Sequence, residues 1–254
     1  MEFTIIGTML LIGMLLGFVG AGGSGFIIAM LSTAFGFSIH TALGTSLAAM
    51  VFTTLSGAFS HYREGNIAVK PGVIIGLTGA AGAWISSGYS AYVPAEHLMW
   101  MTAGMLFLSS VLLWIRTSAM RGPSAKASLP VQGTGIRFWC SAVGIGLVTG
   151  AMSGFFGIGS TPFIQIGMIM LLGLSIRQAA GTTMLVIIPI ALAGGAGYYQ
   201  MGYLDIPLLI QVVVGSMLGS YIGAKFTNRV PLGVLKTAMI AMPSVGALLL
   251  MLRS

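Results

Sequence analysis

Long apolar segments follow one another along almost the entire chain, separated by short polar stretches. They do not show the two-residue alternation that is typical of a transmembrane β-strand. Most are long enough for a helix that crosses the hydrocarbon core of a bilayer. The pattern therefore predicts an all-α integral membrane protein. The segments cover about residues 4–35, 42–61, 71–91 and 97–115 in the first half, and about 138–172, 179–199, 206–224 and 232–252 in the second.

The two halves of the chain are copies of one sequence. A shift of 137 positions aligns them without a gap, and 12 of the 31 pairs between positions 17 and 47 are identical. Shared apolar composition alone would produce scattered matches. It would not align glycines with glycines and prolines with prolines in one register, as this shift does for Pro94 and Pro231. The predicted units are repeat 1 (1–116), a linker (117–136) and repeat 2 (137–254).

The first segment of each half is too long for a single crossing. A helix of about 32 residues would measure about 48 Å, against about 30 Å for the hydrocarbon core. Its middle is rich in Gly and Pro, which are poor helix formers. We expect a helical hairpin or a discontinuous helix there, followed by three spanning helices; one strongly tilted helix is the alternative. The two breaks read Gly20-Ala21-Gly22-Gly23-Ser24-Gly25 and Gly157-Ile158-Gly159-Ser160-Thr161-Pro162.

Composition excludes a soluble protein. The chain is 56% hydrophobic and 6% charged, whereas a soluble domain carries about a quarter charged residues. A net charge of +7 would suggest nucleic acid in a soluble protein, but here basic loops that face the cytoplasm explain it. Cys140 is the single cysteine, which excludes internal disulfides and Cys-x-x-Cys metal sites.

Charge predicts the topology. If each half crosses the membrane an odd number of times, the second half is inverted and ten of the eleven Lys and Arg residues share one side. A parallel duplication, the alternative, would split them seven to four. The positive-inside rule favours the inverted arrangement, which is common in secondary transporters. We expect a multi-pass protein of a bacterial-type inner membrane, with the linker in the cytoplasm.

The two Gly-rich breaks are the first candidate site. A break exposes backbone N–H groups at the start of a half-helix, where the positive helix end attracts an anion. Helix packing through small residues is the alternative, and it suits the glycines outside the breaks: Gly13, Gly17, Gly215, Gly219 and Gly223. The candidate substrate-binding residues are Gly20, Gly22, Gly23, Ser24, Gly157, Gly159, Ser160 and Thr161.

A second motif opens the next segment of each half. Its hydroxyls could line the same anion site, or could bond back to their own helix. The residues are Gly44, Thr45, Ser46, Gly181, Thr182 and Thr183.

The repeat equivalents His40 and Arg177 precede this motif and form a candidate charged gate, although such residues are more often anchors at the membrane edge. The same edge position is expected for His61 and Arg63. Because no acidic residue is predicted deep in the membrane, the sequence names no proton carrier.

Signatures of enzymes, metal sites and bound cofactors are absent from the sequence, including H-E-x-x-H and the P-loop. We therefore expect no enzyme, no cofactor, no metal and no nucleic-acid partner. The expected partners are a small anionic substrate and the lipid bilayer, with a proton or sodium as coupling ion. The sequence does not indicate the oligomeric state. A passive anion channel and a non-transporting membrane assembly subunit are the alternatives to a transporter.

The chain resembles the TauE/SafE family, the sulfite exporter or DUF81 membrane proteins. The resemblance rests on Gly17-Phe18-Val19-Gly20-Ala21-Gly22-Gly23 and Gly44-Thr45-Ser46 with their second-half copies Gly154-Phe155-Phe156-Gly157-Ile158-Gly159 and Gly181-Thr182-Thr183, and it covers nearly the whole chain. It implies transport of sulfite, thiosulfate, a sulfonate such as sulfoacetate, or a related small anion. Alternating access at a midplane site between the repeats is the mechanism expected for such a fold.

Overall fold

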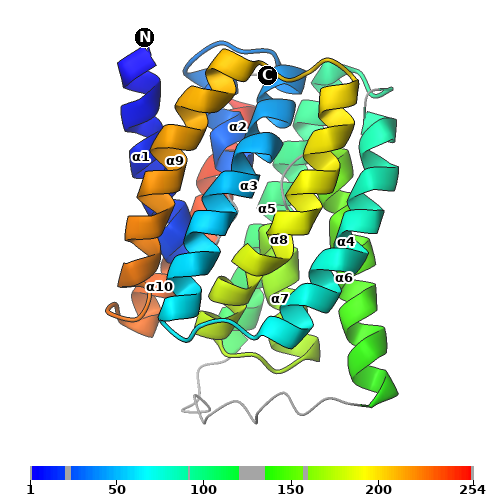
Figure 1. Cartoon of the computed structure of the whole chain (residues 1–254), viewed down its shortest axis with the longest axis vertical. Coiled ribbons are helices and arrows are strands. Elements are labelled where there is room, and N and C mark those ends of the chain that lie inside the picture. Colours follow the sequence, from blue (N-terminus) through cyan, green and yellow to red (C-terminus); the bar gives the residue numbers. More distant parts are fainter. Residues whose placement is uncertain (1, 21–23, 91, 120–134, 157–159, 253–254) are drawn as a thin grey trace.

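The computed structural model describes residues 2–20, 24–90, 92–119, 135–156 and 160–252. These residues form ten helices and no strand (Figure 1), which confirms the all-α prediction. The helices are α1 (Glu2–Val19), α2 (Ser24–Thr33), α3 (Ile39–Arg63), α4 (Val69–Ser90), α5 (Ala95–Ala119), α6 (Ile136–Phe156), α7 (Thr161–Leu171), α8 (Ile176–Gln200), α9 (Ile206–Phe226) and α10 (Leu232–Met251).

Seven of the described helices are long and apolar enough to cross a membrane: α3, α4, α5, α6, α8, α9 and α10. Large apolar side chains such as Leu77, Ile85 and Leu218 point away from the bundle, as expected for a surface that contacts lipid. By contrast, α2 and α7 have 10 and 11 residues. At 1.5 Å per residue they reach only about halfway across the hydrocarbon core.

The first segment of each half forms a hairpin. In Figure 1, α1 starts at the end of the bundle marked N, and α2 leads back to that end. In the second half, α6 starts at the opposite end, and α7 leads back to it. The helix α1 stops where Gly20 adopts a left-handed φ of 67°. The helix α7 starts after Ser160, which is also left-handed, and carries a proline in its first turn. The alternative of one strongly tilted helix is therefore wrong.

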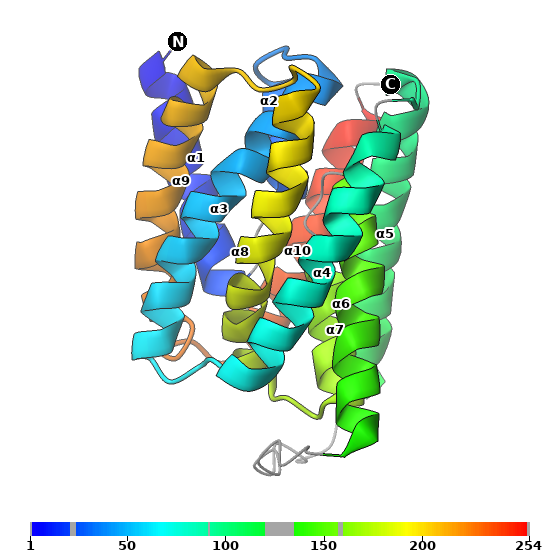
Figure 2. The same ribbon diagram turned by 45° about the vertical axis from the view of Figure 1, so that its right-hand side comes forward.

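Helix packing relates the two halves to each other. α1 packs along α9 as α6 packs along α4, and α3 contacts α9 as α8 contacts α4 (Figure 2). Equivalent helices run in opposite directions: α3 descends in Figure 1 and α8 ascends. These directions agree with the inverted repeat, whose orientation in a membrane stays a prediction. Most of the predicted linker, residues 120–134, lies outside the described residues.

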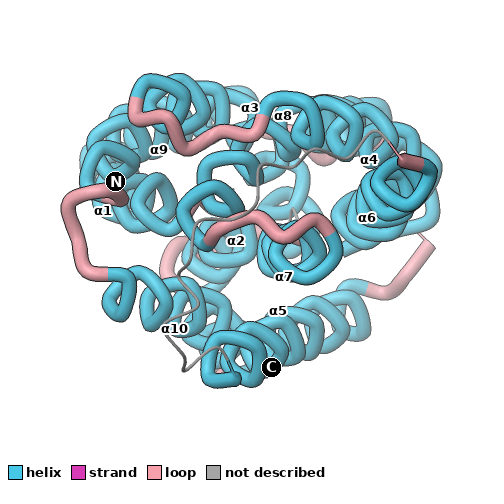
Figure 3. The backbone as a smooth tube through the Cα atoms, turned by 90° about the horizontal axis from the view of Figure 1, so that it is seen from below, coloured by secondary structure: helices cyan, strands magenta, loops and turns pink. Residues whose placement is uncertain are grey.

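The two short helices occupy the middle of the molecule. Viewed along the bundle, α2 and α7 are surrounded by the longer helices (Figure 3). α2 contacts α3 and α10, and α7 contacts α8 and α5. The beginnings of α2 and α7 are therefore enclosed by protein, which is the condition for irregular backbone at membrane depth.

Glycines allow the closest helix contacts. A Cβ atom on Gly17 would overlap the backbone carbonyl of Ser220 in α9, and one on Gly219 would overlap that of Leu10 in α1. The pair α4 and α6 meets in the same way, at Gly79 and Gly150. The glycines outside the breaks therefore serve helix packing, as their spacing predicts.

We expect Gly17→Ala to lower the thermal stability of the protein in detergent. The new methyl group would push α1 away from α9, and overpacking of this kind costs about 1–3 kcal/mol. Gly7→Ala in the same helix is the matched control, because nothing lies within 4 Å of a Cβ atom there. Its stability should be unchanged or slightly raised, since alanine is the better helix former. Equal melting temperatures for the two variants would contradict the packing role of Gly17.

Candidate functional site

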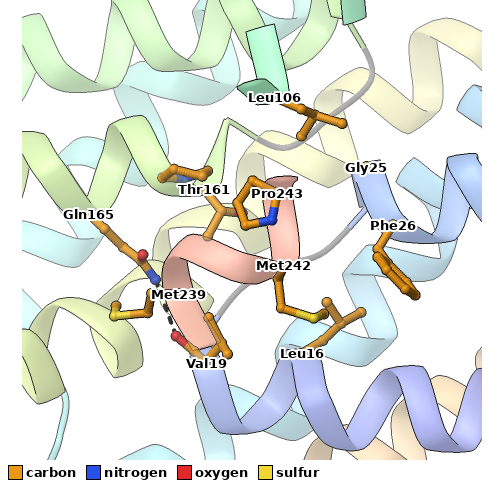
Figure 4. A pocket seen from close by; sticks show the side chains of 11 residues that line it. Leu16, Val19, Gly25, Phe26, Leu106, Thr161, Gln165, Met239, Met242 and Pro243 are labelled. Atoms are coloured by element: carbon orange, nitrogen blue, oxygen red, sulfur yellow. Dashed lines mark hydrogen bonds between the residues drawn. The ribbon is translucent and has the colours of Figure 1, made fainter. Parts of the chain in front are cut away.

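One pocket lies between the beginnings of the two short helices, α2 and α7 (Figure 4). It is bounded by the end of α1, the beginnings of α2 and α7, and the middle of α5 and α10. Its volume is about 30 Å³, room for about two water molecules. The lining residues are Leu16, Val19, Gly25, Phe26, Leu106, Thr161, Pro162, Gln165, Met239, Met242 and Pro243.

The pocket lies where the two repeats meet. Both members of two repeat-equivalent pairs line it: Gly25 with Pro162, and Leu106 with Pro243. A residue and its repeat copy can share one small pocket only near the axis that relates the halves. This is the place where repeat transporters bind substrate.

The polar groups of the pocket are neutral. Thr161 and Gln165 are its polar side chains, and none of its lining residues carries a charge. The first turns of α2 and α7 add backbone N–H groups that have no partner within their own helix. Such helix beginnings attract anions through the N–H groups and the positive end of the helix dipole.

Ser160 precedes α7 in an unusual conformation. It has φ 42° and ψ 27°, a left-handed geometry that costs a non-glycine residue about 1–2 kcal/mol. Its side chain is fully buried, and its hydroxyl has no hydrogen-bond partner. Backbone strain together with an unsatisfied buried donor is typical of binding sites.

The structure places part of the Gly-rich candidate set at this pocket. Thr161 lines it, Ser160 adjoins it, and Gly20 lies just beyond Val19 at the end of α1. The backbone of Ser24 begins α2. The remaining members, Gly22, Gly23, Gly157 and Gly159, lie outside the described residues.

The second motif does not line the pocket. A Cβ atom on Gly44 would overlap the carbonyl of Tyr203, and one on the equivalent Gly181 would overlap that of Asn66. Each glycine therefore packs against a loop of the other repeat. The substrate role of this motif stays a prediction.

The hydroxyls of the second motif differ in their partners. Those of Ser46 and Thr183 bond back to their own helix, to the carbonyls of Leu43 and Ala179 at 3.0 and 2.6 Å. The hydroxyl of Thr182 accepts the N–H of Ala68 at 2.9 Å. That of Thr45 is buried without a partner.

The candidate gate residues lie at opposite ends of the bundle, because α3 and α8 start at opposite ends (Figure 1). The ring of His40 stacks on Tyr203, with centroids 4.9 Å apart, and bonds to the backbone of Val93. Arg177 Nη2 donates to the carbonyl of Val230 at 3.3 Å. Since Val93 and Val230 are repeat equivalents, the two side chains hold equivalent loops.

Sequence reasoning missed Gln165. Its Nε2 donates to the carbonyls of Val19 and Gly20 at 3.3 and 3.2 Å, which ties α7 to the end of α1 across the repeats (Figure 4). Its repeat equivalent is Ile28, so comparison of the two halves did not mark this position as polar in both. The structure buries His61 completely within the protein, in the last turn of α3; its position at the membrane edge stays a prediction.

We expect Thr182→Val to destabilise the protein by about 1–3 kcal/mol, because the N–H of Ala68 would lose its acceptor. Thr45→Val, the same change at the repeat equivalent, should cost almost nothing, since that hydroxyl has no protein partner. Thermal unfolding in detergent measures both. An equal loss in the two variants would show that the Ala68 hydrogen bond contributes little.

Comparison with known proteins identifies the family. The sequence model of the family described as "Sulfite exporter TauE/SafE" matches residues 5–250. The "Probable membrane transporter protein YdhB" of Bacillus subtilis is 51% identical over 247 residues, covering 97% of this chain and 99% of the relative.

More distant relatives carry similar descriptions. A "Probable membrane transporter protein" of Xylella fastidiosa is 27% identical over 88% of this chain and 84% of its own length. The "Probable membrane transporter protein YjnA" of Bacillus subtilis is 25% identical over 90% of this chain and 91% of its own. No solved structure matches. The chain thus belongs to the TauE/SafE sulfite exporter family of membrane transporters.

Proposed function

We propose that the protein is a secondary transporter of a small sulfur oxyanion or organosulfonate, such as sulfite, thiosulfate or a sulfoacetate-like anion. The observation that carries this proposal is the pocket on the axis between the repeats, bounded by the beginnings of both half-helices. The family description supports the chemical class of the substrate.

The polar groups of the pocket suit an anion that must also leave. Thr161, Gln165 and the helix beginnings offer neutral donors to oxyanion oxygens. A lysine or arginine in so enclosed a place would bind an oxyanion tightly and slow its release. Transport requires binding that is favourable enough for entry and weak enough for exit. Neutral donors on helix ends meet both conditions.

The pocket is too small for the proposed substrate in this conformation. A volume of about 30 Å³ holds about two waters, fewer heavy atoms than sulfite has. We infer that α2 and α7 separate on one side and then on the other to admit and release the anion. This is alternating access around a fixed midplane site.

Charge supports an inner-membrane orientation with the linker in the cytoplasm. The seven Lys and Arg residues whose side chains the structure describes belong to loops and helix ends at the end of the bundle where α5 finishes and α6 begins (Figure 1). The positive-inside rule places such an end in the cytoplasm. They are Arg63, Lys70, Arg137, Arg177, Lys225, Arg229 and Lys236.

Anion flux in liposomes that contain only this protein tests the proposal. Sulfite, thiosulfate, a small sulfonate and sulfate would be offered with and without a proton or sodium gradient. Saturable flux that is stimulated by the same anion on the opposite side supports the transporter. A large unitary current would favour a passive channel. Absence of flux from well-folded protein would favour an assembly subunit or another substrate class.

Filling the pocket should stop transport. In Gly25→Leu, the new side chain enters the pocket, where a Cβ atom already meets the flexible end of Leu106 at 2.8 Å. We expect flux to fall by about tenfold or more, equivalent to about 1.4 kcal/mol. Gly104→Leu on α5 is the matched control, because no atom lies within 4 Å of its Cβ position. Undiminished flux in folded Gly25→Leu protein would place the substrate site elsewhere.

A further inference from the structure

The carbonyl end of α1 is capped by side chains of three other elements. The last carbonyls of a helix lack their usual partners, and the membrane interior supplies no water. His61 Nε2 on α3 lies 3.1 Å from the carbonyl of Gly17, and the hydroxyl of Thr227 after α9 donates to Phe18 at 2.9 Å. Gln165 on α7 donates to the next two carbonyls. Four consecutive carbonyls are therefore satisfied.

His61 is the titratable member of this cap. A carbonyl can only accept, so Nε2 carries the hydrogen of the neutral ring, and Nδ1 carries a lone pair. Nδ1 is buried without a partner, and the whole side chain is fully buried. An unsatisfied buried nitrogen is costly. Burial disfavours the charged ring, so a proton binds at this lone pair only in a conformation that gives the new N–H an acceptor or brings in water.

The surroundings of His61 are almost free of competing charge. Glu64, at the end of the same helix, is the charged group that acts on the ring. α7 and α9 present the neutral groups of Gln165 and Thr227. The nearby cations have other partners: Arg63 on the same helix lies over the ring of Phe59 at 5.4 Å, and Arg177 on α8 donates to Val230. At the end of α9, Lys225 lies over the ring of Tyr221 at 4.3 Å and Arg229 over that of Phe226 at 6.0 Å.

The cap exists in one repeat only. The repeat equivalents of His61, Thr227 and Gln165 are Tyr198, Ser90 and Ile28. The hydroxyl of Tyr198 is buried without a hydrogen-bond partner, that of Ser90 donates to the carbonyl of Ser87 at 2.8 Å, and Ile28 has no polar atom, so within the described residues these equivalents do not cap the end of α6. The duplicated fold does not require a histidine at this position.

We propose that His61 binds the proton that couples anion transport to a pH gradient; this inference rests on the proposed function. The proton adds to the Nδ1 lone pair, no bond breaks, and the ring becomes a cation with two N–H donors. The carbonyl end of α1 favours a cation, and the bond to Gly17 becomes charge-assisted. Leu16 and Val19, in the same turn of α1 as the capped carbonyls, line the pocket. Protonation of His61 therefore stabilises one position of the end of α1, which forms part of the pocket wall.

The test separates exchange from accumulation in liposomes. His61→Gln keeps a donor for the Gly17 carbonyl but cannot take up a proton. We expect the variant to exchange sulfite, thiosulfate or the sulfonate across the membrane at a rate similar to the unmodified protein. It should lose the pH-driven accumulation that the unmodified protein shows. His97→Gln on the exposed start of α5 is the matched control and should keep both activities.

The outcomes distinguish the two proposals. If the unmodified protein moves no anion, the proposed function fails. If it exchanges anions but ignores a pH gradient, or if His61→Gln still accumulates anion, the proton role of His61 is overturned. Loss of exchange in a folded His61→Gln protein would make His61 a structural cap and would also overturn the proton role.

A second measurement covers a variant that does not fold. In protein with ¹⁵N-labelled histidine, the His40→Gln and His97→Gln background leaves His61 as the single imidazole. Its nitrogen signals should move from the neutral to the doubly protonated pattern as the pH is lowered. Addition of the transported anion should shift the midpoint. Signals that stay neutral throughout, or a midpoint that ignores the anion, would overturn the assignment.

Discussion

A helix that ends inside a membrane must find partners for its last backbone groups within the protein. Water cannot reach them, and each unsatisfied group costs several kcal/mol. Here two helices, α1 and α6, end at Gly-rich breaks and turn back as α2 and α7. Two other features meet that requirement: the short helices α2 and α7 are surrounded by long helices (Figure 3), and side chains from distant parts of the chain reach the carbonyls at the end of α1. The first turns of α2 and α7 offer N–H groups without partners in their own helices, and we propose that these groups bind the anion.

The close approach of glycine-bearing helices makes this enclosure possible. Where Gly13 and Gly17 face Ser216 and Ser220, the backbones of α1 and α9 touch. Lipid offers no hydrophobic force between helices, so contact of this kind supplies the attraction that holds them. The hydroxyl of Ser216 adds a hydrogen bond of 2.7 Å to Thr53 on α3. These contacts fix α9 against both α1 and α3.

The sequence predicts the features that depend on local composition and on repetition. The duplication, the break in each first segment and the packing glycines are all visible in residue types and their spacing. The capping groups are not visible. Gln165 has a hydrophobic equivalent in the other repeat, and His61 stands beside Arg63 at a segment end, where a polar residue at the membrane surface is expected. Their roles arise only when α3, α7 and the end of α1 meet in space.

The helix pairing also limits which parts can move. The closest pairs, α1 with α9 and α4 with α6, each combine one helix from each repeat. Because their backbones are in contact at glycines, neither pair can slide without a clash. Opening the pocket must therefore leave both pairs together. The movable walls are those without such contacts: the short helices α2 and α7 with their neighbours α10 and α5, which meet through side chains such as Leu106. Under the proposed alternating access, a motion of these walls would open the pocket in turn to each end of the bundle while the outer pairs stay intact.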